Sequence, residues 1–254
     1  MLLVHHIRLP VRGYGGTERV VVALIRGLAA LGHEVILIAP PGTKVPEARL
    51  IAVDAARLTD PRFDLTPLVP GGVDIVHAFF PLRAALALPW VWTLEGTTRP
   101  GHTRPPNTIY VSADHAARHS ATCFVYNGLD PDDFEFRDRK SDYDLFLGRL
   151  HNSKGYQWAI AGARTARRSL VVAGGWRPSL SRQLRFAGLV DGAEKRELLA
   201  GARLLWMPAL WDEPFGLTLI EALWSGTPVL ATRRGALPEV LSPAVAEFGD
   251  DPEE

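Results

Sequence analysis

The chain has 254 residues, of which 47% are hydrophobic and 22% are charged, as in a globular protein with one large or two small domains. Basic and acidic residues balance, so the formal net charge is zero and the strong basic excess that bulk nucleic-acid binding needs is excluded. The single cysteine, Cys123, excludes an intramolecular disulfide. Because it lies in an apolar run, it is expected to be a buried strand thiol.

No targeting or membrane-spanning segment is expected. The first six residues carry neither a basic region nor the start of a long apolar stretch, which argues against a secretory signal. No stretch approaches the roughly 18 uninterrupted apolar residues of a membrane span. We therefore expect a cytoplasmic protein, with peripheral contact at the inner membrane face as an additional option.

Short apolar runs alternate with helix-length amphipathic segments from the N-terminus onward. A strand is predicted at residues 2–6, then a helix over 16–31 in which Val21, Leu24 and Leu28 recur at three- and four-residue spacing. Gly32 stands where a helix C-terminus favours glycine. The other strands predicted in this half are residues 35–39, 73–78, 90–94, 108–111 and 122–126.

The pattern breaks at Asn127-Gly128, and a charged stretch with little apolar periodicity follows. It predicts a domain at 1–128, a linker at 129–141 and a second domain at 142–254. The second alternating series predicts strands at 145–147, 170–173, 184–187, 204–207 and 228–231, with helices at 155–167, 193–201 and 217–225.

This alternation predicts the fold class: α/β, with two Rossmann-like, doubly wound parallel-sheet domains. The second domain is expected to lack its C-terminal helices, since the sequence stops at residues 248–254 without the helices that normally cover the last strands. Self-association through the sheet surface left exposed is a further expectation.

The segment from Glu213 to Glu221 is the strongest local feature. Gly216 permits a tight turn immediately before a helix, whose first N–H groups favour phosphate. The two carboxylates can face one cleft and accept hydrogen bonds from sugar hydroxyls. Taken alone, the pair is better explained by structural roles, with Glu221 complementing the helix dipole and Glu213 a solvated loop residue.

The loop from Gly148 to Gly155 follows a predicted strand and leads into a helix, the place where open α/β sheets bind ligands. Arg149 can hold phosphate oxygens bidentately, and Lys154 adds a compact charge. Alone, these are two exposed cations. Together with the Glu213–Glu221 segment they favour a phosphate site.

The sequence resembles the retaining GT-B glycosyltransferases of family 4, also described as glycosyl transferases group 1. No single motif is specific, but their order and the Glu-x7-Glu spacing are typical of that family. The stretches that carry the resemblance are Gly15-Gly-Thr-Glu-Arg-Val-Val, Gly32-His-Glu-Val, Asp74-Ile-Val-His77, residues 126–134, Gly148-Arg-Leu with Lys154-Gly155, Val172-Ala-Gly-Gly175, residues 213–230 and residues 235–239.

The resemblance implies an enzyme that moves a sugar from a nucleotide-diphosphate sugar to an acceptor hydroxyl with retention, using no metal and no cofactor. The donor would lie between the two domains, and the acceptor would be a saccharide, lipid or small molecule. Arg149 and Lys154 would neutralise the diphosphate, while Glu213 would contact the sugar and Glu221 the ribose. The implied supporting positions are Phe215, Gly216 and Leu217 near the sugar phosphate, Gly15 and Gly16 in a glycine loop, and His77 near the reacting sugar.

The sequence departs from the family pattern at Glu95, where a histidine is frequent. A carboxylate there would repel a diphosphate but could bind an acceptor hydroxyl. Base recognition is open, with candidate lining residues around Gly175-Trp176 and Leu189-Val190.

A doubly wound fold also serves other functions. A dinucleotide-dependent dehydrogenase predicts G-x-G-x-x-G after the first strand and an acid ending the second; Gly13-Tyr-Gly-Gly16 and the strand ending at Ala39 do not fit. A nucleotide-sugar-binding protein without transfer activity is the principal alternative. A sugar-nucleotide epimerase has no internal feature in its favour.

Overall fold

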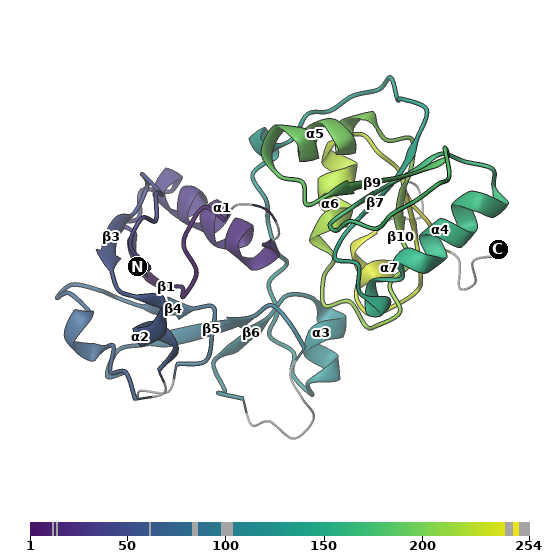
Figure 1. Ribbon diagram of the computed structural model, residues 1–254. Helices are drawn as coiled ribbons and strands as arrows, with labels where there is room; N and C mark the ends of the chain where they lie inside the picture. Colours follow the sequence, from purple (N-terminus) through teal and green to yellow (C-terminus); the bar gives the residue numbers. More distant parts are fainter. Residues whose placement is uncertain are drawn as a thin grey trace. The chain divides into compact units, whose positions relative to one another are not determined.

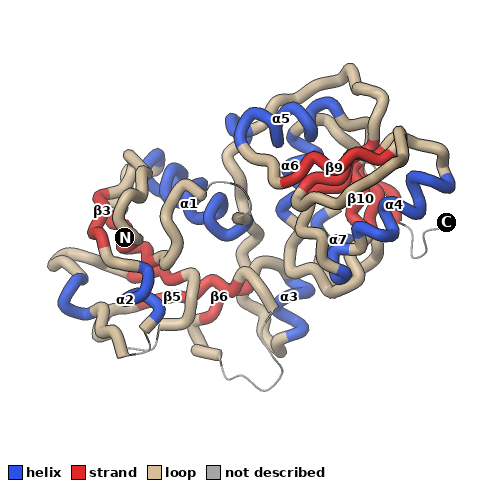
Figure 2. The backbone as a smooth tube through the Cα atoms, in the orientation of Figure 1, coloured by secondary structure: helices blue, strands red, loops and turns tan. Residues whose placement is uncertain are grey.

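The computed structural model describes residues 1–11, 13, 15–60, 62–82, 86–97, 104–241 and 246–248. The chain divides into two compact units, Met1–Gly128 and Leu129–Glu254. Each is built on one six-stranded parallel sheet with helices packed outside it (Figures 1 and 2). The predicted fold class is therefore confirmed, whereas the stretch 249–254, which bears on the predicted loss of the last helices, lies outside the described residues.

The sheet of the first unit has the strand order β3-β2-β1-β4-β5-β6. Its strands are β1 (Leu2–Val4), β2 (Ile36–Ala39), β3 (Arg49–Ala52), β4 (Val76–Ala78), β5 (Trp90–Leu94) and β6 (Thr108–Tyr110), and its α-helices are α1 (Gly16–Ala30), α2 (Ala55–Thr59) and α3 (Ala113–Arg118). The strand order reverses between β1 and β4, because β2 and β3 are added on one side of β1 and β4 to β6 on the other.

Alternating side chains bury both faces of this sheet. Leu3 and Leu37 pack against Val21 and Ile25 of α1, while the opposite face packs against α2 and the loops around it. The C-terminus of α1 is closed as predicted: Gly32 has φ 84° and donates to the Ala29 carbonyl, and His33 donates to the Leu28 carbonyl. These two bonds satisfy carbonyls that the helix itself leaves unpaired.

Two predictions for this unit, the strand at 122–126 and the burial of Cys123, are wrong, and one strand was missed. Residues 122–126 form no strand; only an isolated parallel bridge joins Phe124 to Tyr110. Without sheet neighbours on both sides the segment is not covered, so Cys123 is exposed and Val125 is 61% exposed. Strand β3 was not predicted, because a four-residue edge strand that is mostly exposed carries no clear apolar period.

The sheet of the second unit has the order β12-β11-β10-β7-β8-β9 and reverses between β7 and β10. Its strands are β7 (Asp144–Leu147), β8 (Leu170–Ala173), β9 (Leu184–Gly188), β10 (Leu205–Met207), β11 (Val229–Ala231) and β12 (Ala246–Phe248), and its α-helices are α4 (Tyr156–Thr165), α5 (Gly192–Gly201), α6 (Leu217–Trp224) and α7 (Leu237–Val240).

Neighbouring residues of β7 point to opposite layers. Leu145 packs with α5, α6 and α7, and Phe146 packs with α4. Gly162 lets α4 approach the sheet, since a Cβ there would lie 2.5 Å from the Trp206 ring. The predicted linker residues contact the second unit, where the Lys140 ammonium donates to the Ala200 and Ser225 carbonyls.

Helix length and hydropathy bear on membrane insertion. Among the residues that the structure describes, no helix is both long and apolar enough to cross a membrane.

Candidate active site

The carboxyl ends of β7 and β10, where the strand order of the second sheet reverses, gather the strongest polar candidates. Doubly wound sheets bind ligands at such a reversal. The loop after β7 carries Arg149 and the short 3₁₀ helix Asn152–Lys154, and the loop after β10 carries Trp211 and Glu213. Residues far apart in the sequence therefore reach one edge of one sheet.

Lys154, Trp211 and Glu213 are in direct contact. The Lys154 ammonium donates to Glu213 Oε2 at 2.7 Å, and the Trp211 indole N–H donates to the same oxygen at 2.8 Å. Lys154 Nζ also lies 4.7 Å from the centre of the Trp211 ring, in cation–π geometry. Glu213 is only 8% exposed, and these two donors hold its carboxylate in one orientation.

Two glycines allow the backbone to close around this contact. Gly155, with φ 69°, lies so near the Pro208 carbonyl that a Cβ would overlap it. Gly235, with φ 59°, lies in the same way against the backbone of Glu213, and the next residue, Ala236, donates to the Glu213 carbonyl at 2.9 Å. The loops after β7, β10 and β11 are thus packed against each other by main chain rather than by side chains.

Helix α6 begins beside this cluster. Gly216, with φ 90°, is its N-cap and makes no side-chain cap bond, and the Leu219 N–H donates to the Gly216 carbonyl at 2.9 Å. The first N–H groups of a helix have no partner within the helix, so the N–H groups at Leu217 lie where a ligand could accept from them. Phe215 is 5% exposed and anchors the turn. One turn inside the helix, Glu221 is 3% exposed, and its Oε1 lies 2.5 Å from Nζ of Lys195 in α5.

Arg149 lies at the carboxyl end of β7 and has an exposed side chain. Its backbone is fixed, because Gly174 packs so closely that a Cβ there would overlap the Gly148 carbonyl and lie 3.3 Å from the Arg149 nitrogen. Arg149, Lys154, Glu213 and the start of α6 are therefore all at the carboxyl edge of the second sheet.

The corresponding edge of the first unit carries His77 on β4. The side chain is 7% exposed, its Nε2 lies 2.7 Å from the Thr93 hydroxyl, and its ring stacks on Phe79 at a centroid distance of 4.5 Å. Burial lowers the pKa of His77 to about 4. The imidazole is thus neutral at physiological pH, so one ring nitrogen can donate a hydrogen bond and the other can accept one.

The glycine loop precedes α1. Gly16 is the first helical residue, and a Cβ at Gly15 would lie 2.6 Å from the carboxylate of Glu18. Glu18 is buried and lies 3.6 Å from His5 Nε2. Burial by itself raises the pKa of Glu18, but the nearby His5 imidazole and a backbone hydrogen bond outweigh it, so that the pKa is lowered.

Glu95 follows β5 at the same edge. One carboxylate oxygen, Oε2, accepts a 2.7 Å hydrogen bond from the Asn127 amide, while Oε1 is buried without a hydrogen-bond partner among the described residues. Burial raises the pKa of Glu95 to about 7, against the opposing effect of the Asn127 bond. A carboxyl group half protonated near neutral pH can donate to or accept from a hydroxyl.

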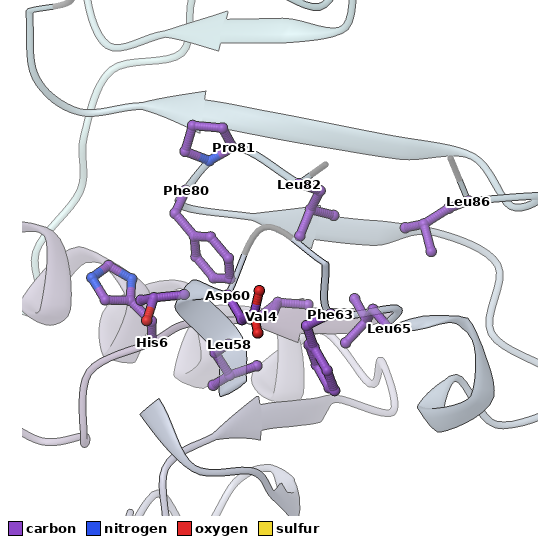
Figure 3. A pocket seen from close by; sticks show the side chains of 11 residues that line it. Val4, His6, Leu58, Asp60, Phe63, Leu65, Phe80, Pro81, Leu82 and Leu86 are labelled. Atoms are coloured by element: carbon purple, nitrogen blue, oxygen red, sulfur yellow. The ribbon is translucent and has the colours of Figure 1, made fainter. Parts of the chain in front are cut away.

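A cavity of about 230 Å³ lies next to the ends of β1 and β4, on the sheet face opposite α1. Figure 3 shows mainly apolar walls, with the His6 ring at one end and Leu86 at the other. Its lining residues are Val4, His6, Leu58, Thr59, Asp60, Phe63, Leu65, Phe80, Pro81, Leu82 and Leu86. The Asp60 carboxylate is engaged by Arg62 at 3.1 and 3.2 Å, so the walls present mostly apolar surface.

Sequence reasoning missed Trp211, Glu18, Thr93 and Lys195. Lys195 carried a usable signal: it lies three and four residues before the buried Leu198 and Leu199, on the inner face of its helix. Nothing in the sequence marks Trp211. In the part of the chain that the structure describes, no group of three or more histidine, cysteine, aspartate or glutamate residues is arranged to hold a metal ion.

Comparisons with known proteins identify the family of the chain. The profile of the family described as Glycosyltransferase Family 4 matches residues 14–173, and that of Glycosyl transferases group 1 matches residues 143–253. A phosphatidyl-myo-inositol mannosyltransferase of Mycobacterium leprae is 26% identical over 293 aligned residues, covering 89% of this chain and 77% of that protein.

Two solved structures cover nearly the whole chain. AviGT4, described as a glycosyltransferase involved in avilamycin A biosynthesis, matches with a TM-score of 0.80 and 29% identity, over 99% of this chain and 85% of its own. A sucrose-phosphate synthase of Thermosynechococcus elongatus matches with a TM-score of 0.73 and 20% identity, over 100% and 86%, and bears on the fold alone. Since one of the two family profiles matches more than half of the chain, this protein belongs to glycosyltransferase family 4 and is a glycosyltransferase.

Proposed function

We propose that this glycosyltransferase moves a sugar from a nucleotide-diphosphate sugar to an acceptor hydroxyl with retention of anomeric configuration, and that it needs no resident cofactor. The observation that carries the proposal is the contact of Lys154 with Glu213 at the strand-order reversal of the second sheet. This contact supports the proposal because Lys154 would hold the diphosphate and Glu213 would accept hydrogen bonds from sugar hydroxyls, next to a helix N-terminus that favours phosphate.

The chemistry explains why these groups would be useful. As the bond from the anomeric carbon to the diphosphate oxygen breaks, the sugar becomes oxocarbenium-like and the departing diphosphate gains negative charge. Arg149, Lys154 and the N–H groups around Leu217 would stabilise that charge. Loss of one such donor typically costs about 3–4 kcal/mol of barrier, or roughly 10²–10³ in rate. Glu213 is assigned to the sugar hydroxyls and not to a covalent intermediate.

We assign the acceptor to the first unit. Its cavity beside β1 and β4 suits an acceptor with an apolar portion, because six leucine or phenylalanine side chains line it. The mycobacterial relative is named for phosphatidyl-myo-inositol, which supports a polyol or lipid-linked acceptor as the first class to test. Glu95 and His77, at the same sheet edge, would contact the attacking hydroxyl or the reacting sugar.

The test begins with calorimetric titration of the full chain with UDP, GDP and ADP in the absence of added metal. Saturable binding of one of them identifies the base, and absence of binding by a folded sample would overturn the proposal. The matching nucleotide sugars are then assayed for turnover, with the anomeric configuration of the product read by NMR. Binding without turnover against any acceptor class would identify a nucleotide-sugar-binding protein instead, and an inverted product would remove the assignment of retention.

A further inference from the structure

Lys195 and Glu221 form a buried pair between two helices of the second unit. Their side chains are 10% and 3% exposed, and Nζ lies 2.5 Å from Oε1. Lys195 is the fourth residue of α5 and Glu221 the fifth of α6. Both helices start at the carboxyl edge of the sheet, so the pair lies about one turn from that edge.

The position of Lys195 is unfavourable for the folded protein in two respects. Burial removes the ammonium from water, and the first turn of a helix repels positive charge through the helix dipole. A buried ion pair commonly contributes less to stability than apolar side chains of similar volume would. The inner face of α5, with Leu198 and Leu199, would accommodate such a side chain. Stability alone therefore gives little reason for a lysine here.

The ammonium has a clear geometric effect on Glu221. A glutamate side chain has several rotamers, and a 2.5 Å contact with a buried cation selects those that keep Oε1 beside Nζ. An ionised carboxylate offers about four acceptor sites, which is more than one ammonium contact uses. Fixing a carboxylate in advance raises its affinity for a diol, because less freedom is lost on binding.

We propose that Lys195 is a positioning residue that holds the Glu221 carboxylate in place to accept hydrogen bonds from the ribose hydroxyls of the donor nucleotide. The inference rests on the proposed function, since it requires the nucleotide site. In this role Lys195 acts through Glu221 and not by contact with the nucleotide. Its effect is therefore confined to selection of the ribose and is absent from recognition of the diphosphate.

The experiment compares ribo- and 2′-deoxyribonucleoside diphosphates of the base that the full chain binds. Calorimetry gives the ratio of the two dissociation constants for the unmodified chain, Lys195→Met, Lys195→Arg and Glu221→Gln. The unmodified chain should prefer the ribonucleotide roughly tenfold or more, the value of one hydrogen bond to a charged group. Lys195→Met should lose most of that preference while binding the deoxynucleotide within about threefold, and Lys195→Arg should retain much of it.

Arg196→Met is the matched control, because it removes one positive charge from the adjacent, exposed position of the same helix. Its ratio should equal that of the unmodified chain. Should circular dichroism show that Lys195→Met does not fold, Lys195→Gln replaces it, since the amide can still donate to Glu221 without charge, and a ratio reduced at least about threefold is expected.

The outcomes distinguish failure of the proposed function from failure of the role of Lys195. No binding of UDP, GDP or ADP by the unmodified chain overturns the proposed function. Binding without preference for the ribonucleotide removes Glu221 from the ribose site and the inference with it. An undiminished preference in folded Lys195→Met, or one reduced by less than about threefold in folded Lys195→Gln, overturns the role of Lys195 and leaves the proposed function standing.

Discussion

Lys154 and Glu213, 59 positions apart in the sequence, meet at 2.7 Å, with the Trp211 indole donating to the same carboxylate oxygen. The cation is therefore neutralised before any anion arrives. A diphosphate at Lys154 would share the ammonium with Glu213, whose carboxylate would still have the indole donor. In the proposed function, this sharing would let Glu213 remain oriented towards a sugar while Lys154 faces phosphate.

Lys154→Ala should weaken binding of the nucleoside diphosphate by roughly tenfold or more, because a charge-assisted hydrogen bond is lost and Glu213 keeps an uncompensated charge. Binding of the corresponding nucleoside should change by less than about twofold. Calorimetry on both ligands measures the contrast, with Arg164→Ala, an exposed cation on α4, as the charge-matched control. Equal weakening of nucleoside and diphosphate would show that Lys154 does not contact the phosphates.

Gly155→Ala should destabilise the second unit by about 2–4 kcal/mol. The left-handed backbone at φ 69° disfavours a Cβ, and that Cβ would overlap the Pro208 carbonyl. Gly27→Ala is the control: it lies inside α1 with nothing within 4 Å of the added atom, and should stabilise the chain by roughly 0.5–1 kcal/mol. Chemical denaturation compares the two variants. If Gly155→Ala lowers the free energy of unfolding by no more than an ordinary surface substitution does, the loop relaxes to accommodate the added methyl group.

The sequence predicted the parts of the fold that periodicity encodes. Helix α1, strand β5 and strand β8 were placed within a residue of their bounds, since buried parallel strands read as short apolar runs and helices as 3.6-residue repeats. Strand β3 was missed because an exposed edge carries no such pattern. Residues 122–126 are apolar enough for a strand, but their exposure depends on neighbours that the local sequence does not specify.

For the candidate site, too, the sequence predicted some features and could not predict others. Lys154 and Glu213 could be singled out because residue type and position relative to strands are visible in the sequence. Their contact, and the part of Trp211 in it, follow from the order of strands in the sheet, which brings β7 beside β10. The buried partnership of Lys195 with Glu221 likewise needs the packing of α5 on α6.

His77→Gln should reduce the acid sensitivity of the protein. Burial lowers the pKa of His77 to about 4, so the unfolded chain takes up this proton below about pH 6.5 while the folded chain does not. Stability from the neutral imidazole is therefore present above pH 6.5 and is lost as pH falls towards 4, by about 2–3 kcal/mol. Denaturation at pH 7, 6 and 5 should give a smaller decline for His77→Gln than for the exposed-site control His33→Gln. Parallel declines would mean that His77 protonates in the folded state.

Glu95→Gln should act with the opposite sign. Burial raises the pKa of Glu95 from 4.5 to about 7, so the folded state retains a proton that the unfolded chain releases. The protonated carboxyl stabilises fully below pH 4.5, and this contribution is lost as pH rises through 7, by up to about 3 kcal/mol. The neutral amide of Glu95→Gln has no such loss, so the stability of this variant relative to the unmodified chain should increase from pH 5 to pH 8. Glu34→Gln, an exposed glutamate of the same unit, should show no such trend. A flat difference for Glu95→Gln would mean that this carboxyl is already ionised at pH 5 and is better solvated than its unpartnered oxygen indicates.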